Sequence, residues 1–281
     1  MKITILGCGC SVGVPVAGCK CKICTSENNK NKRLRSSVFI EIDGINILID
    51  TGPDLRQQLL RAGAPRIDLV ILTHRHYDHV IGLNEIRSYQ FFGPSPLIPV
   101  FTTVDVINYL NLAFPYMFNK VGKLHFTSID YDDKIPFKNF LKKSLSDIDI
   151  SDNTSSNTNN GENFDLSNEC IQVFRQYHAI DSDNLGIKIR DVIYANDVVS
   201  LPTSSEKHFY NLRALILDCK EYEQTSAHIG LENVFEWNQK YKPQKIYLTN
   251  LSHKMDYDIL IARLNGTNIE PCFDGKVIVL D

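Results

Sequence analysis

Residues 71–83 read "ILTHRHYDHVIGL" and place within six positions His74, His76, Asp78 and His79. The mostly apolar run Ile67–Thr73 leads into them and predicts a buried strand. On a turn that leaves a strand, the first two histidines can converge on one ion, and the aspartate and last histidine can reach a second. Imidazole nitrogens and carboxylate oxygens suit zinc, manganese or iron. The pattern therefore predicts a metal site and disfavours a loop of surface histidines.

The overall composition is that of a globular protein. The chain has 281 residues, of which 43% are hydrophobic and 22% charged, which is enough for a sizeable core. Its formal net charge of -3 gives nucleic acid no general attraction. No run approaches the ~20 apolar residues of a membrane span, and Gly7, Gly9 and Gly13 interrupt the apolar stretch that a signal peptide would need. We therefore expect a cytoplasmic protein whose eight cysteines are reduced.

Short apolar runs bounded by Gly, Asp or Pro predict strands in both halves of the chain. In "EIDGINI", Asp43-Gly44 predicts a hairpin turn. Helices are expected at Leu55–Ala62, Asn84–Phe91 and Ala227–Lys240. Two halves, each a sheet covered by helices, fit an α/β sandwich with the sheets inside. The expected strands are Lys2–Leu6, Ser37–Ile42, Ile45–Asp50, Ile67–Thr73, Gln172–Arg175, Gly186–Ile189, Val192–Ala195, Ala214–Leu217, Lys245–Leu248 and Val277–Leu280.

The stretch 146–168 is polar and rich in Asn and Ser. It has too few apolar side chains to offset the entropy of ordering, so we predict a flexible insertion. Candidate site residues lie on both sides of it. It is therefore not expected to mark a domain boundary, and residues 1–281 are predicted to form a single domain.

The H-x-H-x-D-H pattern resembles the signature of the metallo-β-lactamase superfamily. Four further segments match that family in order: Asp50 in "ILIDTGPDLR", His178 in "FRQYHAIDSDNLGIKI", Asp197 in "VIYANDVVSLP", and "IYLTNLSHKMDY" near the end. The matches span nearly the whole chain. The resemblance implies an α/β fold, an αββα sandwich of two mixed sheets with helices outside, and a site for one or two Zn²⁺ or Mn²⁺ ions at the sheet edges.

The resemblance also implies a role for each matching residue. Asp197 would bridge two ions, and Asp50 would orient the site by hydrogen bonds from outside the ligand set. The first ion would be held by His74, His76 and His178, and the second by Asp78 and His79. For His178 and Asp197 taken alone, a buried hydrogen-bonded histidine and a turn residue before Pro202 are the alternatives.

The last motif departs from the family pattern. The family usually has L-T-H, whereas this chain has "LTN", with Asn250 at the place of the histidine. A neutral amide binds a transition metal more weakly than imidazole. We predict a weaker second site, filled at high metal concentration or with substrate; alternatively, His253 takes the missing place.

A cysteine cluster in "GCKCKICTSE" has the spacing C-x-C-x2-C, with Cys19, Cys21 and Cys24. Three thiolates suit a tetrahedral zinc that lacks one ligand; three reduced, unliganded cysteines are the alternative. The cluster resembles a zinc clip in the phosphodiesterase branch of the superfamily, which includes the enzyme of the carbon–phosphorus lyase operon. That resemblance implies His253 as the fourth ligand of a structural Zn²⁺. Packing roles are expected for the other five cysteines, Cys8, Cys10, Cys170, Cys219 and Cys272.

His228 in "SAHIGLENV" resembles a histidine that this branch places beside the leaving group. Imidazole titrates near neutrality and can donate a proton there, so His228 and Asp78 are the predicted catalytic residues. The alternative for His228 is a residue at a helix N-terminus that faces water. Arg35 either contacts a substrate phosphate or caps the sheet edge, and His125 and His208 are expected to be surface or structural residues.

The function implied is that of a metal-dependent phosphodiesterase, in which a metal-bound hydroxide attacks a small cyclic or nucleotide phosphodiester. A thioester or lactam hydrolase on the same fold is one alternative. A non-catalytic metal- and nucleotide-binding protein is another, because Asn250 breaks the ligand set. We expect neither a membrane partner nor a nucleic-acid substrate, since the sequence has no separate basic arm for RNA, and a homodimer is left open.

Overall fold

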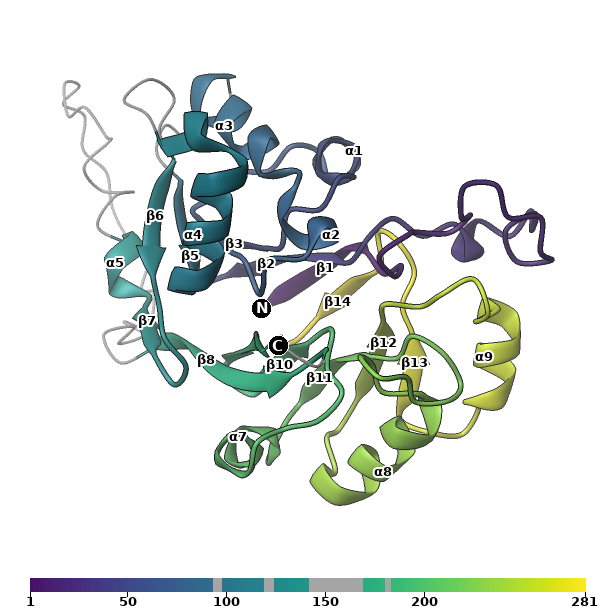
Figure 1. Cartoon of the computed structure of the whole chain (residues 1–281). Helices are drawn as coiled ribbons and strands as arrows, with labels where there is room; N and C mark the ends of the chain where they lie inside the picture. Colours follow the sequence, from purple (N-terminus) through teal and green to yellow (C-terminus); the bar gives the residue numbers. More distant parts are fainter. Residues whose placement is uncertain (93–97, 119–123, 142–168, 180–182) are drawn as a thin grey trace, which may run out of the picture.

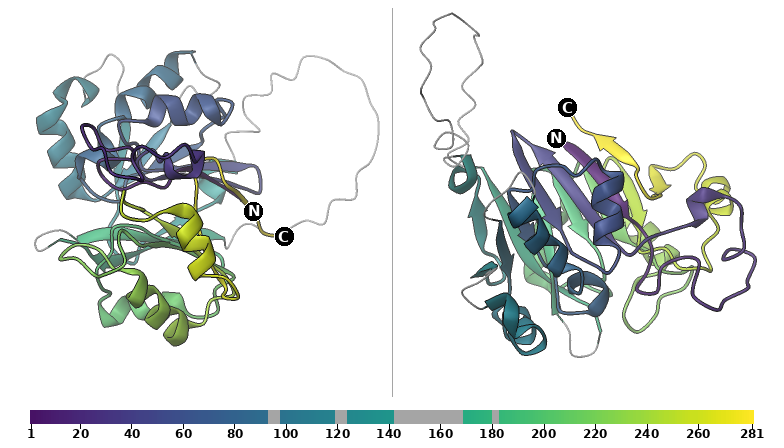
Figure 2. Two further views of the ribbon diagram at one scale, coloured as in Figure 1. Left: turned by 90° about the vertical axis from the view of Figure 1, so that its right-hand side faces the viewer. Right: turned by 90° about the horizontal axis from the view of Figure 1, so that it is seen from above.

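Two mixed sheets lie face to face in the computed structural model, which describes residues 1–92, 98–118, 124–141, 169–179 and 183–281. The predicted insertion 146–168 lies outside the described residues. Each sheet has seven strands within the described part of the chain. Figure 2 shows four layers, with helices above and below the two sheets. The predicted αββα sandwich is therefore confirmed.

The first sheet combines an antiparallel part with a parallel part. The hairpin predicted at Asp43-Gly44 joins two antiparallel strands, and both turn residues have positive φ, 49° and 76°. The parallel part consists of the four strands from β3 to β6. Across the sheet the order is β14 (Val277–Val279), β1 (Lys2–Gly7), β2 (Ser37–Ile42), β3 (Ile45–Ile49), β4 (Leu69–Ile71), β5 (Pro99–Thr102) and β6 (His125–Ser128).

The second sheet is built in the same way from the second half of the chain. Its first four strands are antiparallel, and β10 to β13 run parallel. The chain then returns to the first sheet through β14, so that the two termini lie side by side (Figure 1). The order is β7 (Lys134–Pro136), β8 (Cys170–Tyr177), β9 (Asp183–Ile189), β10 (Val192–Ala195), β11 (Ala214–Asp218), β12 (Ile246–Thr249) and β13 (Ile269–Pro271).

Helices cover the outer faces of both sheets (Figure 1). Among the described residues, none of them is long and apolar enough to cross a bilayer. Short 3-10 turns occur at Asn29–Asn31, Pro115–Phe118 and Lys207–Phe209. The first sheet carries α1 (Leu55–Arg61), α2 (Tyr77–Val80), α3 (Leu83–Phe92) and α4 (Val104–Ala113), α5 (Lys138–Leu141) follows β7, and the second sheet carries α7 (Thr203–Glu206), α8 (Leu231–Tyr241) and α9 (Tyr257–Arg263).

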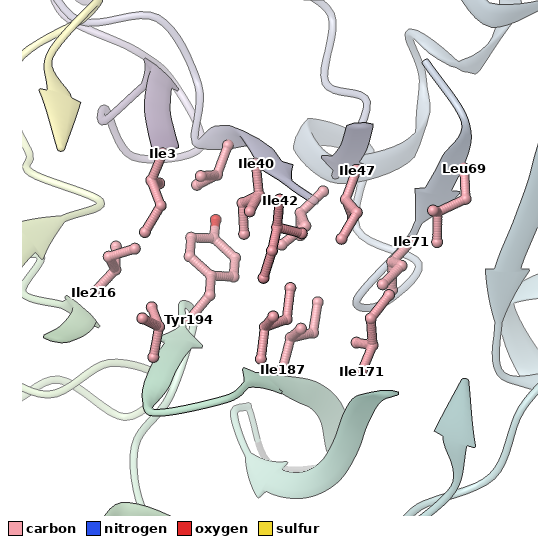
Figure 3. Close-up of a cluster of buried hydrophobic side chains, with 14 of the residues drawn as sticks. Ile3, Ile40, Ile42, Ile47, Leu69, Ile71, Ile171, Ile187, Tyr194 and Ile216 are labelled. Carbon is pink, nitrogen blue, oxygen red and sulfur yellow. The ribbon is translucent and has the colours of Figure 1, made fainter. Parts of the chain in front are cut away.

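The main core lies between the sheets. Figure 3 shows Ile40, Ile47 and Ile71 of the first sheet above Ile187 and Tyr194 of the second. Each fully buried isoleucine contributes about 1.5–3 kcal/mol relative to an exposed one. Strand β10 is buried on both faces, because alternate residues belong to the core between the sheets and to the core under the outer helices, and this explains its continuous apolar sequence. The core thus fixes the strand ends from which the site is built.

The predicted helix at Ala227–Lys240 begins later than expected, at Leu231. Gly230 is the extended residue that precedes it, with φ -103° and ψ 178°. Residues 225–228 form a turn instead, in which the Thr225 backbone N–H donates to the His228 carbonyl over 2.9 Å. His228 therefore lies on a turn that is closed by its own hydrogen bonds, and this places its side chain inside the protein.

Candidate metal centre

The first candidate metal group gathers side chains from three separate loops. His74 and His76 follow β4, His178 follows β8, and Asp197 follows β10. Nδ1 of His76 lies 2.9 Å from Nε2 of His74 and 3.2 Å from Nε2 of His178. Oδ2 of Asp197 lies 3.3 Å and 3.8 Å from the same two Nε2 atoms. Ligands of a tetrahedral zinc with bonds of about 2.0–2.1 Å lie roughly 3.3 Å apart, so the four residues fit one ion.

The remaining ring nitrogens of His74 and His178 hold these two rings in place. Nδ1 of His178 donates to the Ala227 carbonyl over 2.7 Å. Nδ1 of His74 lies 3.0 Å from Oγ1 of Thr73, whose hydroxyl donates to Asp50. In His74 and His178 the N–H is thus engaged on the far side of the ring, which leaves an Nε2 lone pair directed at the common centre. This is the hydrogen-bond pattern of metal-binding histidines.

A second candidate group shares Asp197 with the first. Nε2 of His79 lies 2.9 Å from Oδ2 of Asp197 and 3.2 Å from Oδ2 of Asp78. Nδ1 of His79 donates to Oδ2 of Asp50 over 2.7 Å. Both ligands beside Asp197 come from the short helix α2, so the H-x-H-x-D-H motif supplies residues to both groups. One carboxylate oxygen facing both sets is the arrangement expected of a bridging ligand.

Burial and charge hold His74 and Asp197 in the protonation states that bind cations. Burial, followed by neighbouring His79, lowers the pKa of His74 to about 3, so this imidazole is neutral. Burial alone would raise the pKa of Asp197, but His79 and His74 outweigh it and hold that pKa well below its usual range. Neutral imidazoles and ionised carboxylates are the forms that coordinate metal. At His79 the Asp50, Asp78 and Asp197 carboxylates outweigh burial and raise the pKa, so a bound metal would displace the proton on Nε2. The donor chemistry therefore fits the ions that the sequence predicts.

His228 lies beside the metal groups, paired with an aspartate that sequence reasoning missed. Nδ1 of His228 donates to Oδ2 of Asp218 over 2.8 Å, and both side chains are buried. Burial would lower the pKa of His228, but the Asp218 carboxylate outweighs it and raises the pKa. A water-facing residue at a helix N-terminus is therefore not what the structure shows. A signal existed in the sequence: "LILD" before Asp218 repeats the apolar pattern of "ILID" before Asp50.

Asn250 occupies the end of β12, next to the shared aspartate. Its Nδ2 lies 2.6 Å from Oδ1 of Asp197 and 3.0 Å from Oδ1 of Asp218. The alternative in which His253 takes the missing ligand place is wrong for this structure, because the His253 ring lies among the clip cysteines. Because this chain has Asn and not His at position 250, an amide contacts Oδ1 of Asp197, the carboxylate oxygen that does not face the metal groups.

The cysteine cluster forms a separate candidate zinc site. Nδ1 of His253 lies 3.3 Å from Sγ of Cys19, 3.6 Å from that of Cys21 and 3.5 Å from that of Cys24. Bonds of about 2.3 Å to sulfur and 2.0 Å to nitrogen would place tetrahedral S and N ligands roughly 3.5 Å apart. The Cys24 backbone N–H, with further hydrogen bonds, lowers the pKa of the Cys21 thiol to about 6. The four predicted ligands are therefore together and fit a zinc ion.

Other polar residues singled out in the sequence have structural roles. Arg35 pairs with Asp54 over 3.1 Å and donates to the Ser11 carbonyl, which corresponds to the capping alternative. His208 stacks on Phe174, with ring centres 5.0 Å apart, and His125 is exposed on β6. Among the described residues, none of the remaining cysteines belongs to a candidate metal group, as expected. Four of these five cysteines are buried, namely Cys8, Cys10, Cys219 and Cys272, and the fifth, Cys170, is partly buried.

A cavity of about 740 Å³ opens beside the first metal group. His74 and Arg75 line one part, and Tyr131 and Arg175 line another. The Arg175 guanidinium lies 4.3 Å from the centre of the Tyr131 ring and pairs with Asp183 over 3.3 Å. Pockets for small molecules commonly measure about 300–1,000 Å³. Of the proposed ligands His74 lines the cavity, which thus has room for a small polar molecule next to that residue.

The sequence matches a family model described as a beta-lactamase superfamily domain over residues 45–250. That range includes the two groups described above and a third candidate group, Asp197, Asp218 and His228, and excludes the cysteine cluster with His253. An octanoyltransferase of Porphyromonas gingivalis is 41% identical over 121 residues, which are 43% of this chain and 24% of that protein. Ribonuclease Z of Nanoarchaeum equitans is 31% identical over 107 residues, 34% of this chain and 33% of that protein. The chain thus spans a third or less of these relatives.

A solved structure shares the whole fold. A diphosphatase of the PhnP family superposes with a TM-score of 0.82 at 25% identity, over 100% of this chain and 98% of the other. The diphosphatase and ribonuclease Z are hydrolases by name. The enzyme class predicted from the sequence is therefore the class of these similar proteins.

Proposed function

The chain belongs to the beta-lactamase superfamily, and on that basis we propose that it is a metal-dependent phosphodiesterase acting on a small cyclic or nucleotide phosphodiester. One observation carries the proposal. Oδ2 of Asp197 lies between two sets of ligand atoms, 3.3 Å from Nε2 of His74 and 2.9 Å from Nε2 of His79. One set contains His74, His76 and His178, and the other contains Asp78 and His79.

These residues would hold two ions, Zn²⁺ or Mn²⁺, with Asp197 between them. Such a pair lowers the pKa of water and polarises a phosphoryl oxygen when bound. The second ion would be the weaker one, because the set of Asp78, His79 and Asp197 has no imidazole from position 250. Asp50 supports it by fixing the His79 ring through the 2.7 Å hydrogen bond.

His228 would protonate the oxygen that leaves phosphorus. Its Nδ1 donates to Asp218, so its Nε2 is the atom available for proton donation. Its ring lies 4.8 Å from the ring of His178, which places it at the edge of the ligand set. The Asp218 carboxylate, against the opposing effect of burial, raises the pKa of His228, so a protonated ring persists nearer neutral pH.

The cavity and the relatives support a small polar substrate. The space beside His74 is lined by Arg75, Arg175 and Tyr131 together with four aspartates, a polar lining that suits a sugar or nucleoside better than an acyl chain. The likeness to a diphosphatase points the same way. The identity with ribonuclease Z favours RNA as a second candidate substrate. We further propose a cytoplasmic location, where the clip thiolates stay reduced and hold a structural Zn²⁺.

Turnover of bis(p-nitrophenyl) phosphate tests the proposal. The protein is freed of active-site metal and then assayed with added Zn²⁺ or Mn²⁺. We expect turnover, and a loss of at least about 100-fold in His76→Ala, because the first ion loses a ligand. His125→Ala, on the exposed face of β6, is the matched control and should remain active.

A panel of substrates then separates the candidate functions. Cyclic nucleotides, dinucleotides and a pre-tRNA distinguish small phosphodiesters from RNA, and a thioester and a β-lactam represent the other hydrolase class. Turnover of only the last two would contradict the proposal. Absence of turnover with every metal, together with tight nucleotide binding, would favour a non-catalytic binding protein.

A further inference from the structure

We propose that Asn250 is a positioning residue, whose amide joins the shared metal ligand Asp197 to the Asp218–His228 pair. This inference rests on the proposed function of His228 as the proton donor. The Asn250 Nδ2 group has two hydrogens and two carboxylate neighbours, and Nδ1 of His228 lies 3.1 Å away from it. It lies 2.6 Å from Oδ1 of Asp197 and 3.0 Å from Oδ1 of Asp218. All four side chains are buried, so water does not replace either bond at low cost.

The bond to Asp197 orients the shared carboxylate. Its Oδ2 faces the ligand nitrogens of His79 and His74, at 2.9 Å and 3.3 Å. Its Oδ1 points away from them, toward the amide of Asn250. An amide donor on Oδ1 therefore leaves Oδ2 as the atom that meets both metal groups. Rotation of the carboxylate would break this short hydrogen bond.

The bond to Asp218 completes the environment of the second carboxylate. Oδ2 of Asp218 accepts from Nδ1 of His228 over 2.8 Å and from the Val198 backbone N–H over 3.0 Å. Oδ1 accepts from Asn250. With all three donors in place, Asp218 keeps its Oδ2 on the His228 Nδ1–H, and Nε2 of His228 faces the site. Without the Asn250 amide, Oδ1 of Asp218 would compete with Oδ2 for the N–H groups of His228 and Val198.

Strand register brings the three partners together. Asp218 of β11 pairs with Thr249 of β12, so Asn250 follows immediately beside it. Asp197 follows β10, the neighbour of β11 on its other side. Asn250 and Asp197 both have positive φ, 61° and 52°, a conformation that Asn and Asp adopt more readily than most residues. The next residue, Leu251, is anchored by its N–H to the Cys8 carbonyl over 2.8 Å.

An imidazole at position 250 would not replace this bridge. A histidine whose one ring nitrogen binds metal retains a single N–H, whereas the Asn amide offers two from one atom. Position 250 therefore supplies a pair of hydrogen bonds where the family pattern has a metal ligand. The exchange predicts two separable effects of Asn250→His: tighter binding of the second ion and poorer alignment of His228.

Leaving-group dependence tests the alignment. Zinc-loaded wild type, Asn250→Ala, Asn250→His and His228→Ala are compared on phosphodiesters with p-nitrophenolate, phenolate and alkoxide leaving groups. Poor leaving groups need the proton most. We expect both Asn250 variants, like His228→Ala, to lose at least about tenfold more activity on the alkoxide than on the p-nitrophenyl substrate. Asn268→Ala, which breaks a remote amide pair with Asn238, is the matched control and should keep the wild-type profile.

A spectroscopic readout is independent of turnover. Long-range ¹H–¹⁵N spectra of histidine-labelled, zinc-loaded protein report which ring nitrogen of His228 carries the proton. We expect the Nδ1–H form in wild type and in Asn268→Ala, and a mixture of tautomers in Asn250→Ala. If that variant does not fold, Asn250→Ser and Asn250→His supply the same comparison.

The outcomes separate this inference from the proposed function. A flat leaving-group profile in His228→Ala would remove the proton donor itself and so overturn the proposed role of His228. A steep profile in His228→Ala together with wild-type profiles and tautomers in the Asn250 variants would overturn the positioning role. An ion held by Asp197, Asp218 and His228 in an anomalous-scattering map, and lost in Asn250→Ala, would also overturn it, because Asn250 would then be a ligand.

Discussion

Oδ2 of Asp50 accepts a hydrogen bond of 2.7 Å from Nδ1 of His79, and both side chains are buried beneath the metal groups. Asp50 also accepts from the Thr73 backbone N–H over 2.8 Å and from the Thr73 hydroxyl. It follows β3 with a positive φ of 62°. The carboxylate therefore fixes the tautomer of one proposed ligand and the loop that carries the others.

Asp50→Asn should weaken the second metal site while leaving the fold intact. An amide that donates to Nδ1 would favour the tautomer with hydrogen on Nε2, which blocks the atom that faces Asp197. Loss of such a supporting partner typically costs about 10- to 100-fold in metal affinity. Competition with a coloured chelator measures that affinity. Asp68→Asn, at the other end of β4, is the control, and an unchanged second affinity in Asp50→Asn would contradict the assignment.

Much of the site could be predicted because its signals are local. The motif from His74 to His79 is contiguous, and Asp197 follows a strand that is apolar throughout. The partner of His228 could not be predicted in the same way. Asp218 ends an apolar strand just as Asp50 does, but no local pattern indicates which imidazole it meets. The bridge made by Asn250 depends on the register of β10, β11 and β12, which tertiary packing decides.

The fold was predictable where apolar runs were long. Central strands such as β2 and β10 appear within the predicted ranges because both faces are buried. Strands β7 and β13 have only three residues each, too few to show a period of two. Strand β6, "HFTS", has no fully buried residue and forms an edge. The start of α8 was misplaced because the turn at 225–228 is stabilised by the Thr225 hydroxyl, a tertiary detail within a helix-like pattern.

Cys21→Ser should remove the ion of the cysteine clip and lower thermal stability. The clip joins the loop before β2 to the segment after β12, and a structural zinc contributes its binding free energy to folding. We expect one fewer equivalent of zinc by atomic emission and a fall in Tm of roughly 5 °C or more. Cys170→Ser, at the start of β8 and outside every candidate metal group, is the control. Equal zinc content in both variants would exclude the clip.

Arg33→Met should destabilise the same region without touching a proposed ligand. The buried guanidinium donates to the Ser252 and Met255 carbonyls, over 2.9 Å and 2.6 Å. Methionine fills part of the space but leaves the Met255 carbonyl unpaired and the Ser252 carbonyl with only its 3.1 Å hydrogen bond from the Met255 N–H. We expect a cost of about 2–4 kcal/mol of unfolding free energy. Urea denaturation measures it. The exposed pair of Arg66 with Asp68 gives the control Arg66→Met, expected to change by less than about 1 kcal/mol. If Arg33→Met and Arg66→Met lost the same unfolding free energy, the buried hydrogen bonds of Arg33 would contribute no more than the exposed ion pair.

Asp256 should make the start of α9 sensitive to acid. Its Oδ1 accepts from the backbone N–H groups of Asp258 and Ile259, over 3.0 Å and 3.1 Å, and its Oδ2 accepts from Asn31. Burial would raise the pKa of this carboxyl, but these hydrogen bonds outweigh it and lower the pKa. Because the pKa of Asp256 is lower in the folded state, its charge stabilises the protein above the unfolded-state pKa of about 3.9. This stability is lost as the pH falls through the folded-state pKa.

Asp256→Ala should therefore lose about 1 kcal/mol at pH 7, the usual effect of removing an N-cap. The difference from wild type should shrink as the pH falls from about 5 toward 3, because the wild-type carboxyl becomes protonated and caps less well. Urea unfolding at a series of pH values measures both quantities. Asp256→Asn is the matched control: it keeps a capping oxygen and removes the titration, so it should match wild type at pH 7 and exceed its stability in acid. A loss in the alanine variant that stays constant across this range would show that the charge of Asp256 does not act on the helix.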